Sequence, residues 1–161
     1  MKAPLLALAA TLALGIAASA LAAGGSSDPA PAATSRPVDS NFTRAKAMIE
    51  AKDYRGAIPL LQQVVAKESR NADAYNLLGF ATRKSGDPQG SLPHYQQALA
   101  IDAKHLGAHE YLGEAYLMLD RLAEAEQMLA RLDSLCVFGC AEHRMLRTAV
   151  ANHKQGKKPT N

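Results

Sequence analysis

Apolar residues along the chain follow the spacing of amphipathic helices, and three segments repeat the same order of small and large positions. The segments span residues 54–64, 88–98 and 122–132, and in each a small residue is followed four positions later by a large one. The small residues are Ala57, Ser91 and Ala125, and the large residues are Leu61, Tyr95 and Leu129. Both sets recur every 34 positions, which predicts three copies of one helical unit.

A second feature has the same period, because Leu78-Gly79 recurs 34 positions later as Leu112-Gly113. We interpret each unit as two antiparallel helices, with small residues where the two backbones approach closely. One such hairpin cannot bury its apolar side alone, so the units must stack. The composition agrees: aromatic residues make up 5% of the chain and Trp is absent, so Leu, Ala, Val and Met must form the core.

The 34-residue unit resembles the tetratricopeptide repeat. In the second unit the resemblance rests on Tyr75, Leu78, Gly79, Gly86, Ser91, Tyr95 and Ala98, and in the third on Leu112, Gly113, Tyr116, Ala125, Leu129 and Leu132. The first unit departs from the pattern, with Arg44 and Ala45 in place of Leu-Gly. The resemblance implies an all-α fold, a short right-handed superhelix of three hairpins at about residues 38–71, 72–105 and 106–135.

Local signals support the hairpins. Asp53, Asp87 and Asp120 each precede a predicted second helix, where a carboxylate can accept hydrogen bonds from free backbone N–H groups. Pro59 and Pro93 fall inside two of these helices, where each removes one hydrogen bond, so we expect a tolerated bend at matched places.

A capping helix is predicted at about residues 140–154, where Ala141, Met145, Leu146 and Ala149 have helical spacing. Cys136 precedes it and Cys140 begins it, and in an exported protein we interpret the pair as a structural disulfide. Two alternatives stay open: a soft-metal site that includes His143, and a redox-active dithiol. The spacing matches neither Cys-x-x-Cys nor the haem-attaching Cys-x-x-Cys-His motif.

If the resemblance holds, the first helices line a concave groove that binds a protein or peptide. Carried over unit by unit, the groove residues are Phe42, Lys46, Glu50, Asn76, Phe80, Arg83, Lys84, Glu110, Glu114 and Leu117. Phe42 and Phe80 are the expected apolar anchors. Only Asn76 has a counterpart in the Lys and Asn clamp with which some members of the family hold a terminal carboxylate.

The ends of the chain indicate export. Residues 1–22 have the layout of a signal peptide, with Lys2 before an apolar run and small residues near Ala22. Residues 23–37 are predicted to be a flexible linker, 38–154 the repeat domain and 155–161 a disordered tail. We therefore expect a periplasmic or secreted protein without stable membrane insertion after cleavage.

No pattern in the sequence predicts catalysis or a cofactor. A formal net charge of +3, without a basic stripe carrying interleaved aromatics, argues against nucleic acid as a partner. His105 and His109 are four positions apart, but His105 falls in a turn between units and His109 replaces an aromatic of the repeat. We predict a non-enzymatic adaptor or assembly factor for a protein partner. The alternatives are a metal or redox accessory protein and self-association through the open end of the first unit.

Overall fold

Seven helices make up the computed structural model over residues 39–157, the part of the chain that it describes. They are α1 (Ser40–Glu50), α2 (Tyr54–Lys67), α3 (Ala72–Lys84), α4 (Pro88–Ile101), α5 (Leu106–Met118), α6 (Leu122–Leu135) and α7 (Ala141–Lys154). This part contains no β-strand. The predicted signal peptide at 1–22 and linker at 23–37 lie outside the described residues, as do residues 158–161 of the predicted tail.

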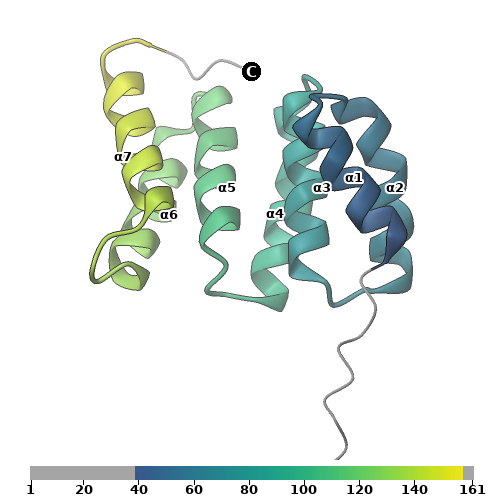
Figure 1. The fold of residues 1–161 in the computed structure, drawn as a ribbon. Coiled ribbons are helices and arrows are strands. Elements are labelled where there is room, and N and C mark those ends of the chain that lie inside the picture. The colour runs from purple at the N-terminus through teal and green to yellow at the C-terminus, as the bar shows by residue number, and fades with distance from the viewer. Residues whose placement is uncertain (1–38, 158–161) are drawn as a thin grey trace, which may run out of the picture. The chain divides into compact units, whose positions relative to one another are not determined.

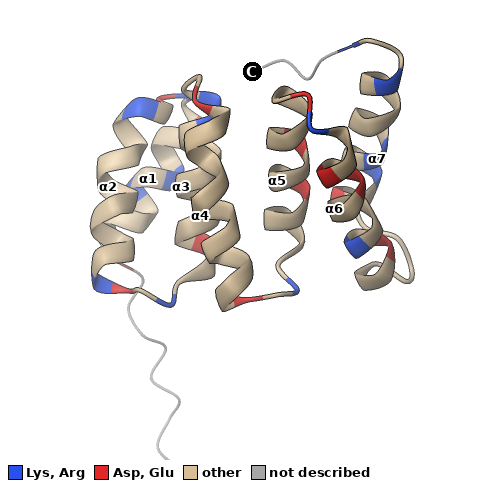
Figure 2. Cartoon of the chain, turned by 180° about the vertical axis from the view of Figure 1, so that it is seen from behind, with Lys and Arg blue, Asp and Glu red and all other residues tan. Residues whose placement is uncertain are grey.

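The helices pair along the chain into three hairpins, α1 with α2, α3 with α4 and α5 with α6, and α7 packs against α5 and α6. The first helix of each hairpin and α7 form one face, whereas α2, α4 and α6 form the opposite face (Figures 1 and 2). We call the surface formed by α1, α3, α5 and α7 the first-helix face. The predicted fold class, an all-helical stack of three hairpins closed by a further helix, is confirmed.

Two of the three predicted second-helix caps form. The Asp53 carboxylate accepts the N–H of Gly56 at 3.0 Å, and the Asp87 carboxylate accepts the N–H of Gly90 at 2.7 Å. The prediction for Asp120 is wrong, because α6 begins one residue later, after Arg121, and has no side-chain cap. Asp87 plus 34 positions gives Arg121, so Asp120 is one residue out of register and instead adopts a left-handed turn with φ 57°.

The two prolines predicted inside second helices do not end them. Pro59 lies within α2 and Pro93 within α4, and both helices are continuous through these positions. Both side chains are exposed, so the hydrogen bond that each removes lies on the solvent side of its helix.

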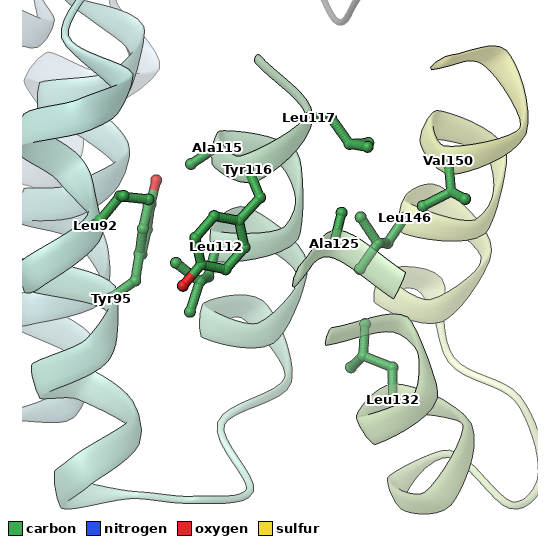
Figure 3. Packing of buried hydrophobic residues seen from close by; sticks show 10 residues of the cluster. All are labelled: Leu92, Tyr95, Leu112, Ala115, Tyr116, Leu117, Ala125, Leu132, Leu146 and Val150. Carbon is green, nitrogen blue, oxygen red and sulfur yellow. The ribbon is translucent and has the colours of Figure 1, made fainter. Parts of the chain in front are cut away.

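Leucines at 34-residue intervals connect the hairpins. Leu78 and Leu112 are 2% exposed and Leu146 is fully buried, and the three lie on α3, α5 and α7. The period therefore continues beyond the third hairpin, and α7 occupies the place of the first helix of a fourth unit. Figure 3 shows Leu146 and Val150 of α7 directed toward the side chains of α5 and α6 in one shared cluster. The closing helix thus buries the apolar side of the third hairpin.

Close helix approaches occur at the two predicted glycines. A Cβ added at Gly79 would lie 2.7 Å from Cε1 of Tyr95, on the other helix of the same hairpin. A Cβ at Gly113 would lie 2.5 Å from Cδ2 of Leu146, so the neighbour here is α7. Between residues 39 and 157, no helix is long and apolar enough to cross a bilayer.

Replacement of Gly113 by Ala should destabilise the domain by about 1–3 kcal/mol, because the new Cβ would lie 2.5 Å from Cδ2 of the fully buried Leu146, which would have to shift. Denaturant unfolding followed by circular dichroism measures the loss. Gly107→Ala is the matched control, since its new Cβ would meet its nearest neighbour, Nδ2 of Asn76, at an ordinary 3.4 Å. In the double variant Gly113→Ala/Leu146→Ala the clash is removed, so the loss of stability should be smaller than the sum of the losses in the two single variants. A loss equal to that sum would place the contact elsewhere.

Candidate functional site

The ten residues predicted to line the groove all lie on α1, α3 and α5, but they differ widely in exposure. Lys46 and Glu50 are exposed, and the half-buried residues are Phe42, Phe80, Lys84 and Glu114. Four others are buried: Asn76, Arg83, Glu110 and Leu117. The accessible part of the predicted site is therefore smaller than the sequence indicates.

Leu117 does not belong to the groove. Its side chain is fully buried in the cluster that includes Leu146 and Val150 of α7. Figure 3 shows it directed toward α7. The prediction was wrong because it assigned to the groove a side of α5 that the capping helix, α7, covers.

Arg83 is buried at the junction of the second and third hairpins, with 3% of its surface exposed. Its Nη2 donates to Oε2 of Glu114 at 2.8 Å across the two hairpins, and its Nε donates to the hydroxyl of Tyr95 at 3.3 Å. Burial raises the pKa of Tyr95, so this hydroxyl stays neutral. A buried guanidinium needs such partners, because losing one of them leaves an uncompensated charge. Arg83 is thus part of the framework, and its side chain is not free to bind a partner.

Aromatic rings surround the Arg83 guanidinium, whose Cζ lies 5.6 Å from the ring centroids of both Phe80 and Tyr111. The Phe80 ring also contacts Tyr54 edge-on at 5.9 Å and Tyr111 at 5.0 Å between centroids. Phe80 is half-buried, so part of its ring remains accessible beside this group. The structure therefore offers a fixed aromatic surface, because contacts from three helices restrict the orientation of the ring.

Glu110 is a buried carboxyl group with no ion pair or hydrogen bond to its side chain among residues 39–157. Burial first, and then the carboxylates of Glu114 and Glu142, raise its pKa to about 7, although Arg83 lowers it. Glu142 comes from α7, so three carboxyl groups meet where α5 and α7 pack. Protonation of Glu110 relieves the repulsion among them.

Asn76 occupies the position on α3 that corresponds to Glu110 on α5, 34 residues earlier. It is 7% exposed, and its Oδ1 has no donor within the described segment. The Oε1 of Glu110 also lacks one. Two neighbouring first helices therefore each hold an unpaired acceptor, and both suit a group that carries N–H bonds.

Cys136 and Cys140 form a disulfide, with their Cα atoms 5.6 Å apart. His143 donates its backbone N–H to Sγ of Cys140, and its ring Nε2 lies 2.6 Å from Asp133. The bond leaves neither sulfur as a thiolate, and the described residues contain no group of three potential metal ligands. The loop that the bond closes exposes Val137 and Phe138.

The two histidines near the start of α5 make different contacts. Nδ1 of His105 accepts the N–H of Ala108 at 3.1 Å and caps α5, while its Nε2 faces Asp73 at 3.0 Å. His109 directs Nε2 to the carbonyl oxygen of Ala103 at 3.1 Å. The two rings therefore have separate partners.

Sequence reasoning missed the contribution of α7 to the first-helix face. Arg144 and Thr148 correspond to Glu110 and Glu114 one period later, and both are exposed. The signal was present, because Leu146 follows Leu112 by 34 positions. Tyr54 and Tyr111 were also missed, and no spacing in the sequence distinguishes them from ordinary core residues.

Two models of the tetratricopeptide repeat family match the chain, one over residues 42–105 and the other over residues 83–135. The fold is similar to that of the Yersinia enterocolitica type III secretion translocator chaperone SycD, with a TM-score of 0.65, 18% identity, and coverage of 72% of this chain and 82% of SycD. SycD in complex with a peptide of the translocator YopD gives a TM-score of 0.62 at 20% identity, covering 72% and 88%. At these identities the likeness concerns the fold. A search of curated proteins gave no significant match.

Glu110→Gln should make the domain more stable above pH 7 by about 2 kcal/mol and leave it unchanged near pH 4. The folded-state pKa of about 7 exceeds the ordinary value of 4.5, so the wild type loses stability as the pH rises between them. Unfolding midpoints measured from pH 4 to 8 test this. Glu50→Gln, at an exposed site on α1 without an ion pair in the described part of the chain, should follow the wild-type profile. Parallel profiles for Glu110→Gln and wild type would contradict the assignment.

Replacement of both Cys136 and Cys140 by Ser should lower the free energy of unfolding by about 2 kcal/mol, the chain-entropy estimate for so short a loop. Protein purified without reductant should contain no free thiols, and peptide mass spectrometry should locate the bond. Reduction of the wild type should reproduce the loss seen in the variant. Bound zinc or copper that disappears in His143→Ala would instead support the metal-site alternative.

Proposed function

Because the chain belongs to the tetratricopeptide repeat family, we propose that it is a periplasmic adaptor or assembly factor that holds a peptide segment of another protein on its first-helix face. Recognition relies on side-chain complementarity, and no bond is made or broken. The observation that carries the proposal is a row of accessible side chains across this face.

Lys46, Phe80, Glu114 and Thr148 occupy equivalent positions on α1, α3, α5 and α7, each 34 residues after the last. A segment that crosses the four helices meets a cation, an aromatic ring, a carboxylate and a hydroxyl in that order. The ring of Phe80 is held by Tyr54 and Tyr111, so its accessible edge is a preorganised apolar contact. The proposed partner therefore places an apolar residue at α3.

The charges on the first-helix face favour one orientation of the proposed peptide. Near α1 the exposed Lys46 makes no ion pair within residues 39–157, and it favours an acidic residue of the partner. Between α3 and α7 the half-buried carboxylates of Glu114 and Glu142 both act on the pKa of Glu110, so they lie in one acidic region. These groups favour a basic residue, or a backbone N–H, of the partner.

Two further observations support the proposal. A structure of SycD contains a bound peptide of its translocator YopD, so a stack of this fold can hold a peptide. The Cys136–Cys140 disulfide suits an oxidising compartment, which agrees with the export expected from residues 1–22.

Photoreactive residues placed at positions 46 and 148 should crosslink the same partner in intact cells, whereas positions 62 and 96, exposed on α2 and α4, should not. Lys46→Glu should then weaken binding of the identified partner by about tenfold, with an unchanged circular dichroism spectrum. Arg70→Glu, an exposed charge in the turn between α2 and α3, is the matched control. Equal crosslinking from position 96 would place the partner on the opposite face.

A further inference from the structure

A cavity of about 330 Å³ lies between the α4–α5 turn, the start of α5 and the end of α6, away from the row of side chains proposed to bind the peptide. Leu99 and Leu135 give it an apolar part. Lys104, Arg131 and His109 supply polar and cationic groups. Small-molecule sites begin at about 300 Å³ and typically combine an apolar lining with a few convergent polar groups, as this cavity does.

Comparison with the preceding unit identifies what is particular to this place. His109 occupies the position of Tyr75, and Arg131 that of Gln97, in each case 34 residues later. The third unit thus has a smaller, polar ring where the second has a phenol, and a cation where the second has an amide. Leu135 corresponds to Ile101, so the apolar part stays comparable.

His109 is 5% exposed, and its Nδ1 is buried without a hydrogen-bond partner in the described part of the chain. Its Nε2 must donate, because the carbonyl oxygen of Ala103 at 3.1 Å can only accept. In a ring that carries one proton Nδ1 is then an acceptor, which a water molecule in the cavity satisfies and a carboxylate does not, so the anion is assigned to the two cations.

The two cations beside this ring are not neutralised. Neither Lys104 nor Arg131 forms an ion pair with any residue between 39 and 157. Nearby carboxylates have other partners, since Asp102 accepts the backbone N–H of Lys104 and Asp133 pairs with His143. The cavity therefore combines uncompensated positive charge with an apolar wall.

We propose that this cavity binds a small organic anion, a carboxylate with a short aliphatic tail. The carboxylate lies between Lys104 and Arg131, where a guanidinium offers paired donors, and the tail contacts Leu99 and Leu135. His109 gives the ligand the space that Tyr75 occupies in the preceding unit. The site is separate from the proposed peptide surface, so either proposal can fail without the other.

Titration of the isotope-labelled protein, from residue 23 to its C-terminus, with sodium butyrate tests the proposal by nuclear magnetic resonance. Saturable shifts should concentrate at Leu99, Lys104, His109 and Leu135, with a dissociation constant on the order of 1 mM. Sodium chloride at equal ionic strength and butylamine, which has the same tail and a cationic head, should not produce them.

Two variants use the residues that the preceding unit has at these positions. Arg131→Gln should weaken butyrate binding by about tenfold, the typical effect of losing a charge-assisted hydrogen bond. His109→Tyr should abolish binding by filling the cavity, and if it does not fold, Arg131→Gln still decides the question. Arg147→Gln, an exposed arginine on α7, should bind like wild type. Shifts that do not saturate, equal shifts with butylamine, or unchanged affinity in Arg131→Gln would overturn the proposal.

Discussion

The fold depends on the stacking of its hairpins, because a helical hairpin with one apolar side cannot bury that side by itself. Leu78, Leu112 and Leu146 are each buried between their own helix and the preceding hairpin. The third hairpin would expose its apolar side without α7, which supplies Leu146 and Val150 and then ends. A single helix, α7, therefore takes the place of a further hairpin, because it buries the apolar side of the third hairpin.

Ion pairing at the junction of the second and third units adds a different kind of constraint. Arg83 is held by Glu114 and Tyr95 and lies beside the rings of Phe80 and Tyr111. A buried ion pair is weak evidence for stability, but its geometry tolerates few alternative packings. We interpret the Arg83 group as what fixes the relative placement of these two units. That placement keeps Phe80 at a defined angle on the first-helix face, so the framework and the proposed binding surface depend on the same side chains.

The period of 34 made the fold predictable, because position within a unit decides which side of a helix each residue occupies. It did not decide whether a neighbouring helix covers that side. Leu117 and Arg83 stand at groove positions of the repeat, yet α7 buries the first and a network across two hairpins buries the second. Asp120 shows the other limit, since a carboxylate one residue out of register cannot cap the helix that follows. Burial is the main cause of the elevated pKa of Glu110, and the carboxylates of Glu114 and of Glu142 on α7 add to it, so the shift required the tertiary structure.

The disulfide loop and the unequal burial of the two end helices make the two ends of the stack different in local stability. α1 contributes one fully buried side chain, Ala45, whereas α7 contributes Leu146 and Val150 and is tied to the end of α6 by Cys136–Cys140. In a linear array each unit is stabilised by its neighbours, so opening starts where the terminal contacts are weakest. We therefore expect amide exchange to begin in the amino-terminal hairpin and to reach the carboxy-terminal helices last.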